Sequence, residues 1–169
     1  MNWITDKFKR IKPKIKNLFR VKIGPEGKLW ENCSCGAVLY KQDLKENLYV
    51  CNKCNKHHRI DPKERFQILF DEGQYQEISP MLPAIDDPLI FTDSKSYGMR
   101  LKQAREETGQ HDSVVLATGK VNNVYLVAGA MNFNFMGGSV GRAAGEAFVA
   151  GAEFAYANKL AYVFFSTSG

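Results

Sequence analysis

The sequence has no run of about 18 consecutive apolar residues, the length that a helix needs to cross a bilayer. Its N-terminus is basic but lacks the apolar stretch of a secretory signal peptide. We therefore expect a soluble, cytoplasmic protein with no membrane span. Apolar residues still make up 44% of the 169 residues and aromatic residues 12%, so a buried core is expected.

Several motifs of catalysis and nucleotide binding are also missing. No G-x-G-x-x-G segment follows a predicted strand, and no Gly-Lys-Ser marks a phosphate-binding loop. No signature of a Ser-His-Asp triad is present either. These absences argue against a dinucleotide fingerprint, a P-loop enzyme and a triad hydrolase.

Net positive charge is confined to the first 28 residues. Residues 1–28 contain nine Lys or Arg and two acidic residues, a net charge of +7, which leaves the other 141 residues at −2. Apolar residues recur in this basic tail at helical spacing, although Pro13 would break or kink a helix: Ile4, Phe8, Ile11, Ile15 and Leu18. We expect either a solvated tail that orders in a larger assembly, or a segment that binds RNA, an acidic partner or an anionic membrane surface.

Cysteine is confined to four positions within 22 residues: Cys33, Cys35, Cys51 and Cys54. In a reducing compartment such a cluster indicates metal binding rather than disulfides. Zinc takes four thiolate or imidazole ligands in a tetrahedron, and two turns that each present a cysteine pair supply them. We expect a zinc ribbon over residues 29–58, with strands at 37–40 and 48–50 and a polar connection at 41–47. Gly36 and Asn55 follow the two pairs and tolerate the positive φ of such turns.

The first cysteine pair is spaced C-x-C where a ribbon uses C-x-x-C. Either its turn is reshaped and all four sulfurs bind zinc, or one cysteine drops out and His57 or His58 completes the tetrahedron. We favour the four-cysteine site because the second pair is intact and all four cysteines lie within the hairpin. A closed site of this kind folds the module and leaves no coordination position for chemistry.

Residues 59–110 predict a connecting region of helices and extended chain. Asp61 and Pro62 form a helix start, and Gly73 is expected to end that helix. The segment from 77 to 93 contains three prolines and predicts an extended surface stretch. A second, polar helix should open at Asp93 or Ser94 and finish near Gly109.

Residues 111–169 predict the beginning of a layered α/β domain. Two apolar strands flank Asn122-Asn123, a strong hairpin signal, and an alanine-rich helix and a final strand follow a glycine-rich loop. Gly137 and Gly138 in that loop either let backbone N–H groups approach a negatively charged ligand or simply permit a tight turn.

Five segments, taken together, resemble the β subunit of bacterial acetyl-coenzyme A carboxylase carboxyltransferase: LWENCSCGAVLYKQDLKENLYVCNKC, HHRIDPKERFQILFDEG, DSKSYGMRLKQA, AMNFNFMGGSVGRAAGEAF and FFSTSG. The resemblance covers about residues 29–169. It implies a zinc ribbon followed by a ClpP/crotonase-like domain. It also implies an α2β2 complex with a separate α subunit that works with biotin carboxylase and the biotin carboxyl carrier protein. The implied reaction transfers a carboxyl group from carboxybiotin on the carrier to acetyl-CoA and gives malonyl-CoA for fatty acid synthesis.

The resemblance also implies site residues. Gly137 and Gly138 would line the acyl-CoA site, and Gly169 would open the catalytic loop that forms an oxyanion hole. The biotin ureido group would take the methyl proton, so this chain need not supply a base. Two features depart from the family: the short C-x-C pair, and an end at Gly169 where family members continue. We therefore expect a fragment, one piece of a split subunit or a truncated product.

Two other functions remain open at this point. A zinc-ribbon module with a basic tail is compatible with weak RNA or DNA binding, although few exposed aromatic residues alternate with basic ones in the ribbon. The second function is that of a non-catalytic scaffold that only binds the α subunit.

Overall fold

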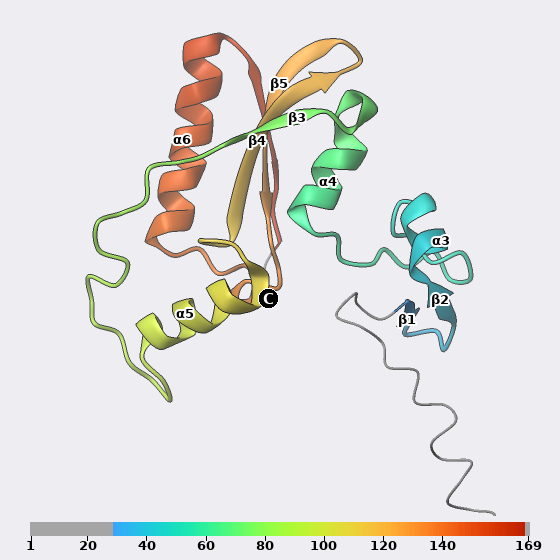
Figure 1. Ribbon diagram of the computed structural model, residues 1–169, viewed down its shortest axis with the longest axis horizontal. Helices are drawn as coiled ribbons and strands as arrows, with labels where there is room; N and C mark the ends of the chain where they lie inside the picture. Colours follow the sequence, from blue (N-terminus) through green and yellow to red (C-terminus); the bar gives the residue numbers. More distant parts are fainter. Residues whose placement is uncertain (1–28, 168–169) are drawn as a thin grey trace, which may run out of the picture. The chain divides into compact units, whose positions relative to one another are not determined.

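The computed structural model describes residues 29–167, which form two compact units that divide between His57 and His58 (Figure 1). The basic tail of residues 1–28 and the last two residues, including Gly169, lie outside the described residues. Within the described part of the chain, no helix is long and apolar enough to span a bilayer.

The first unit is a small ribbon. Strands β1 (Trp30–Asn32) and β2 (Val38–Tyr40) pair antiparallel, and helix α3 (Lys41–Glu46) follows β2 directly. The buried apolar cluster beneath them consists of Leu39 and Leu44 with Cys33 and Cys51. So small a core indicates that the cysteines hold this unit together.

Two expectations for the ribbon were wrong. The polar stretch predicted as a connection, residues 41–47, is mostly helix α3, whose Leu44 is 3% exposed and anchors it to the core. The strand predicted at 48–50 does not form, because Leu48 and Tyr49 have φ of 52° and 62° and only Val50 makes a bridge, to His57. The second strand of the hairpin is instead β1, which precedes the first cysteine.

The second unit is built on a four-stranded sheet in the order β3-β4-β5-β6. Strands β3 (Tyr75–Ile78), β4 (Val114–Val121) and β5 (Val124–Met131) are antiparallel, and β6 (Ala161–Phe165) runs parallel to β5. The predicted hairpin is confirmed, since Asn122 and Asn123 form its turn with φ of 50° and 65°. Strand β3 overlaps the first two residues of the segment predicted as extended, 77–93, and was not foreseen as a strand.

Three helices surround the sheet. Helix α4 (Pro62–Leu69) begins as predicted, with the Asp61 carboxylate accepting the Lys63 N–H at 2.9 Å, and a 3-10 turn (η1, Asp71–Gly73) follows it. Helix α5 (Tyr97–Thr108) starts later than predicted, because Ser96 caps it while Asp93 pairs with Arg100. Helix α6 (Arg142–Asn158) connects β5 to β6.

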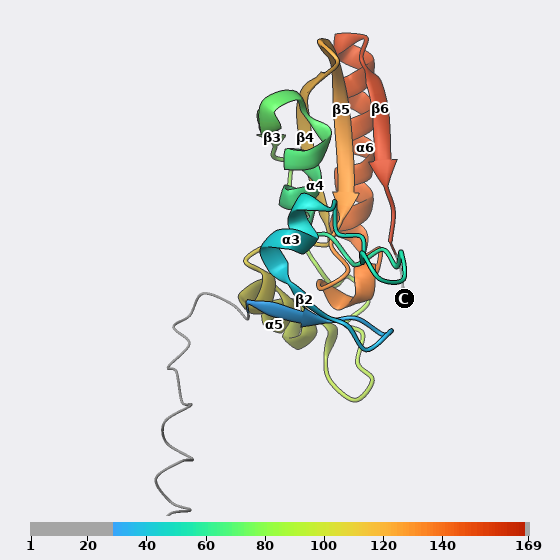
Figure 2. The ribbon, with the colours of Figure 1, turned by 90° about the vertical axis from the view of Figure 1, so that its right-hand side faces the viewer.

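The helices cover both faces of the sheet (Figures 1 and 2). Phe66 and Phe70 of α4 pack on one face, against Ala117, Ala128 and Ala130. Small residues of α6 pack on the other face, in a cluster with the ends of β4 and β5: Val114, Leu116, Met131, Ala144 and Ala147. This layered arrangement places the loop between β5 and α6, which contains the two candidate glycines, at one end of the sheet.

Candidate metal centre and glycine loop

The four cysteine sulfurs meet in one cluster, all within 4.8 Å of one another. Cys33 Sγ lies 3.6 Å from Cys54 Sγ, and Cys35 Sγ lies 3.9 Å from Cys51 Sγ. A tetrahedral zinc ion with Zn–S distances of about 2.3 Å separates its sulfurs by about 3.8 Å. The sulfur positions therefore fit a tetrahedral zinc ion, and neither His57 nor His58 belongs to the cluster.

Reshaped turns bring the sulfurs together despite the short C-x-C pair. In the first turn the Cys33 N–H donates to the Ala37 carbonyl at 2.8 Å, and Gly36 has φ of 86°. In the second turn the Asn55 N–H donates to the Cys51 carbonyl at 2.9 Å, with Asn55 at φ of 59°. The positive φ expected at these two residues is confirmed, and it is what closes each turn.

The electrostatics of the cluster also favour a cation. A hydrogen bond with the Lys56 backbone lowers the pKa of the Cys54 thiol, but desolvation and the three neighbouring sulfurs outweigh it and raise that pKa from 9.0 to about 12. The Cys54 thiol therefore retains its proton until a metal ion balances the charge of its thiolate. With four sulfur ligands the site is closed, so it suits folding rather than chemistry.

The glycine loop lies between β5 and α6 and turns tightly at Met136–Gly138 (η2). Met136, Gly137 and Gly138 have φ of 49°, 70° and 74° in succession. Gly138 is buried, and a Cβ atom built on it would lie 2.4 Å from the Thr167 carbonyl oxygen. Gly138 is therefore required for close packing against the segment after β6.

The two candidate glycines differ in how their N–H groups are used. The Gly138 N–H donates to the Phe135 carbonyl at 2.9 Å and so is occupied inside the loop. The Gly137 N–H makes no hydrogen bond within residues 29–167, and a Cβ atom on Gly137 would meet nothing within 4 Å. Of the two, only Gly137 offers a donor to a ligand.

A groove of about 360 Å³ opens beside Gly137. One wall is a face of α5 and the other is the glycine loop, with these lining residues: Arg100, Gln103, Ala104, Glu107, Asn134, Met136, Gly137 and Ser139. Arg100 forms an ion pair with Asp93, although its buried Nε makes no hydrogen bond within residues 29–167, and Glu107 accepts a hydrogen bond from Gln103 at 2.7 Å. The groove thus offers a backbone donor beside charged and polar side chains, and none of its lining residues is His, Cys, Lys or Tyr.

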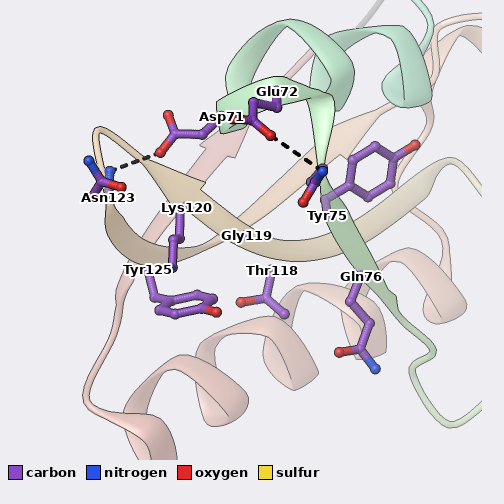
Figure 3. A pocket seen from close by; sticks show the side chains of 10 residues that line it. Asp71, Glu72, Tyr75, Gln76, Thr118, Gly119, Lys120, Asn123 and Tyr125 are labelled. Atoms are coloured by element: carbon purple, nitrogen blue, oxygen red, sulfur yellow. Dashed lines mark hydrogen bonds between the residues drawn. The ribbon is translucent and has the colours of Figure 1, made fainter.

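A larger hollow, of about 460 Å³, lies at the other end of β5, beside the hairpin turn (Figure 3). The Asp71 carboxylate there accepts the N–H groups of Asn122 and Asn123 at 2.9 and 2.8 Å. The Lys120 ammonium lies 5.0 Å from the centre of the Tyr125 ring. These groups satisfy one another and stabilise the hairpin, and no residue predicted for the site lines this hollow.

Sequence patterns did not identify the residues that support the glycine loop. Asp112, Ser113 and Asn132 are buried at its base, and Arg100 and Gln103 lie across the groove. A polar pair directly before an apolar strand was the available signal for Asp112 and Ser113. Gly169, predicted as the catalytic backbone donor, lies outside the described residues.

Comparison with known proteins gives a consistent result. A family model described as the acetyl-CoA carboxylase zinc finger domain matches residues 30–54, the ribbon with all four cysteines. The predicted fold class, an α/β chain that opens with a zinc ribbon, is confirmed by this match, the cysteine cluster and the sheet.

Whole-chain relatives carry one name, acetyl-coenzyme A carboxylase carboxyl transferase subunit beta. The protein of Dinoroseobacter shibae is 41% identical over all of this chain and 52% of its own length. Those of Pelagibacter ubique and Liberibacter asiaticus are 41% and 43% identical, again over the whole chain, which covers 55% and 58% of them. The chain therefore spans about half the length of the curated relatives that it matches.

Proposed function

Because this chain is, along its whole length, a relative of the acetyl-coenzyme A carboxylase carboxyl transferase β subunits, we propose that it serves as a β-type chain of such an enzyme. The proposed reaction moves the carboxyl group of carboxybiotin, held on the biotin carboxyl carrier protein, to acetyl-CoA and yields malonyl-CoA and the uncarboxylated biotin, which stays on the carrier. The observation that carries this proposal is the Gly137 N–H at the groove beside α5, which makes no hydrogen bond within residues 29–167.

The proposed role of Gly137 follows from the charge that develops in the reaction. Removing a proton from the methyl group of acetyl-CoA gives an enolate, whose oxygen becomes negative in the transition state. A fixed backbone N–H directed at such an oxygen contributes about 2.7–4 kcal/mol in mutational tests of comparable sites. Gly137 supplies one such donor, Gly138 shapes the loop around it, and Gly169 is proposed to supply another.

The groove is suited to this role because the chain does not have to supply a base. The resemblance implies that the biotin ureido group takes the methyl proton, so the chain itself needs only to bind and orient the thioester. The one carboxylate of the groove, Glu107, accepts a hydrogen bond from Gln103 and lies on α5. Because the one cation of the groove, Arg100, is paired with Asp93, the groove fits the amide-bearing arm of coenzyme A better than its phosphates, which require cations.

We propose that Cys33, Cys35, Cys51 and Cys54 together bind one structural zinc ion. The fit of their sulfur positions to a tetrahedron supports this ligand set. The ion would hold the ribbon in its folded form and take no part in carboxyl transfer. A reducing cytoplasm, which we propose as the location, keeps such thiols available.

We further propose the organisation and partners of the chain. Residues 1–28 form a basic tail, 29–58 the ribbon, 59–110 a connecting region and 111–169 the beginning of the crotonase-like carboxyltransferase domain. Partners are an α subunit in an α2β2 complex, biotin carboxylase and the carrier protein. The names of the relatives support a place in acetyl-CoA carboxylase, and the individual partners follow from the family resemblance.

The experiment is reconstitution. The zinc-loaded chain is mixed with the α subunit, and malonyl-CoA-dependent carboxylation of biocytin, the reverse half-reaction, is measured. Gly137→Leu should abolish turnover by filling the groove. The matched control is Gly109→Leu, because Gly109 has nearly the same left-handed φ, 67° against 70°, and equally open space around it.

Three outcomes separate the candidate functions. Turnover that is lost in Gly137→Leu and kept in Gly109→Leu supports the β-subunit proposal. A folded, zinc-loaded chain that binds the α subunit without turnover would favour the scaffold. RNA affinity that falls steeply with added salt, in a chain without turnover, would favour the nucleic-acid module.

A further inference from the structure

Three buried polar residues lie together at the base of the glycine loop. Asp112, Ser113 and Asn132 are 8%, 0% and 3% exposed, and within residues 29–167 they are the only buried residues of polar or charged type. A buried polar group lowers stability unless hydrogen bonds satisfy it, so such groups are kept where they have a specific task. All three flank the point where β5 ends and the loop begins.

Ser113 binds the exit of the loop through its side chain. Its hydroxyl donates to the Ser139 carbonyl oxygen at 3.0 Å. The Asp112 carboxylate oxygen Oδ1 accepts the Ser113 N–H at 2.8 Å and lies 3.3 Å from the same hydroxyl. Asp112 therefore fixes the backbone of Ser113 and is the more distant of two acceptors for its single hydroxyl proton, the nearer being the Ser139 carbonyl.

Ser113 also binds the entrance of the loop, through its main chain. The Asn132 N–H donates to the Ser113 carbonyl at 2.6 Å. The Asn132 side chain continues this support, since its Oδ1 accepts the Asn134 N–H at 2.9 Å and its Nδ2 donates to Gln110 at 3.1 Å. Ser113, the residue directly before β4, thus holds both ends of the segment from 132 to 139.

Ser139 connects its contact with Ser113 to the turn that contains Gly137. The Ser139 N–H and hydroxyl both donate to the Met136 carbonyl, at 3.3 and 2.8 Å, so Ser139 closes the turn that contains Gly137. If the Ser139 carbonyl is released, the turn is free to rotate about its entrance. The Gly137 N–H would then no longer be held in one orientation beside the groove.

We propose that Ser113 is the positioning residue of the glycine loop: its hydroxyl, by binding the Ser139 carbonyl, fixes the direction in which the Gly137 N–H points. The link from loop position to catalysis rests on the proposed function, whereas the link from Ser113 to the loop does not. A donor must lie close to the site of developing charge to be effective, so a loosened loop lowers turnover more than it lowers affinity.

The first test measures the loop directly by amide hydrogen exchange in the whole zinc-loaded chain. Ser113→Ala should speed exchange of the Gly138 and Ser139 amides about tenfold, the usual worth of one hydrogen bond. Thr118→Val is the matched control, because the Thr118 hydroxyl also donates from β4 to a main-chain carbonyl, that of Leu126, at 3.0 Å. It should leave loop exchange unchanged.

Unchanged loop exchange in Ser113→Ala, or an equal rise in Thr118→Val, would overturn the proposal. Ser113→Cys keeps a weaker donor of similar size and should give an intermediate rate. If the alanine variant does not fold, the cysteine variant decides the question, and loop exchange equal to that of the wild type would then count against it.

The second test measures turnover in the complex with the α subunit. Ser113→Ala should lower kcat about tenfold with little change in KM, because the missing interaction acts in the transition state. A rise in KM at constant kcat would contradict a positioning role. If the wild-type complex shows no turnover, the proposed function fails, and the exchange measurement still decides whether Ser113 holds the loop.

Discussion

The two units of this chain are held together by different means. Residues 29–57 bury only Leu39 and Leu44 beside two of their four cysteines. Residues 58–167 bury aromatic and aliphatic side chains on both faces of a sheet. We therefore expect the first unit to depend on a metal ion for its folding, whereas the second is stabilised by apolar packing and keeps a groove open.

Removal of zinc should have the largest effect, and only on the ribbon. Structural zinc contributes about 10–16 kcal/mol of apparent binding free energy in small peptides, far more than two leucines can supply. A strong chelator, or Cys51→Ala, should unfold residues 29–57 and leave the amide spectrum of β4 and β5 unchanged.

Ser34→Ala is the control for the metal experiment, because it alters the residue between two ligands and removes only a hydrogen bond from Lys56. Zinc content and amide spectra of this variant should match those of the wild type. Simultaneous loss of the sheet signals on chelation would show that the two units do not differ as described.

A cavity made in the sheet unit should destabilise that unit and leave the ribbon unaffected. Phe66 is 0% exposed and packs among Phe70 and Tyr75, so Phe66→Ala should lower the free energy of unfolding of residues 58–167 by about 3–5 kcal/mol. Zinc affinity should not change. Ile68→Ala on the same helix, at a side chain 37% exposed, should cost much less in denaturant titrations.

Substitutions at the two loop glycines should distinguish the packed position of Gly138 from the open position of Gly137. Gly138→Ala combines left-handed strain with a clash at the Thr167 carbonyl and should destabilise the sheet unit by roughly 3 kcal/mol. Gly137→Ala meets open space and should cost only the strain, about 1–2 kcal/mol. Equal losses in thermal unfolding would contradict the distinct roles given to them.

In the zinc-loaded chain, high pH should produce the smallest effect on the sheet unit. Burial raises the pKa of Tyr162 from 10.0 to about 12. Because the folded chain holds this proton more tightly than the unfolded chain, stability is unaffected below about pH 10 and falls as the pH rises from about 10 to about 12. Tyr162→Phe should flatten this decline, whereas Tyr156→Phe, at a residue 88% exposed, should not.

Local chemistry predicted much of the fold. Asp61-Pro62 gave the start of α4, and Asn122-Asn123 gave the β4-β5 hairpin, because both signals depend on a few neighbouring residues. The ribbon hairpin was harder. Leu48–Val50 has strand-like residues, but the end of α3 forces two of them into positive φ, and β1 is recognisable only from its pairing with β2.

The candidate site was predicted in part for the same reason. Cysteine spacing is a local signal and led to the sulfur cluster. The unequal use of the Gly137 and Gly138 N–H groups depends on how the loop closes on Phe135, and the role of Ser113 depends on contacts with residues 19 and 26 positions away. The residues next to Ser113 in the sequence do not indicate that it contacts these distant residues.

The most direct measurement is a titration of the zinc-loaded, nitrogen-15-labelled chain with acetyl-CoA, followed through its backbone amide signals. The account predicts that the Gly137 amide shifts together with amides of α5 along the groove, while those of residues 29–57 do not move. Shifts confined to the ribbon, or a Gly137 amide unaffected at saturating ligand, would contradict it.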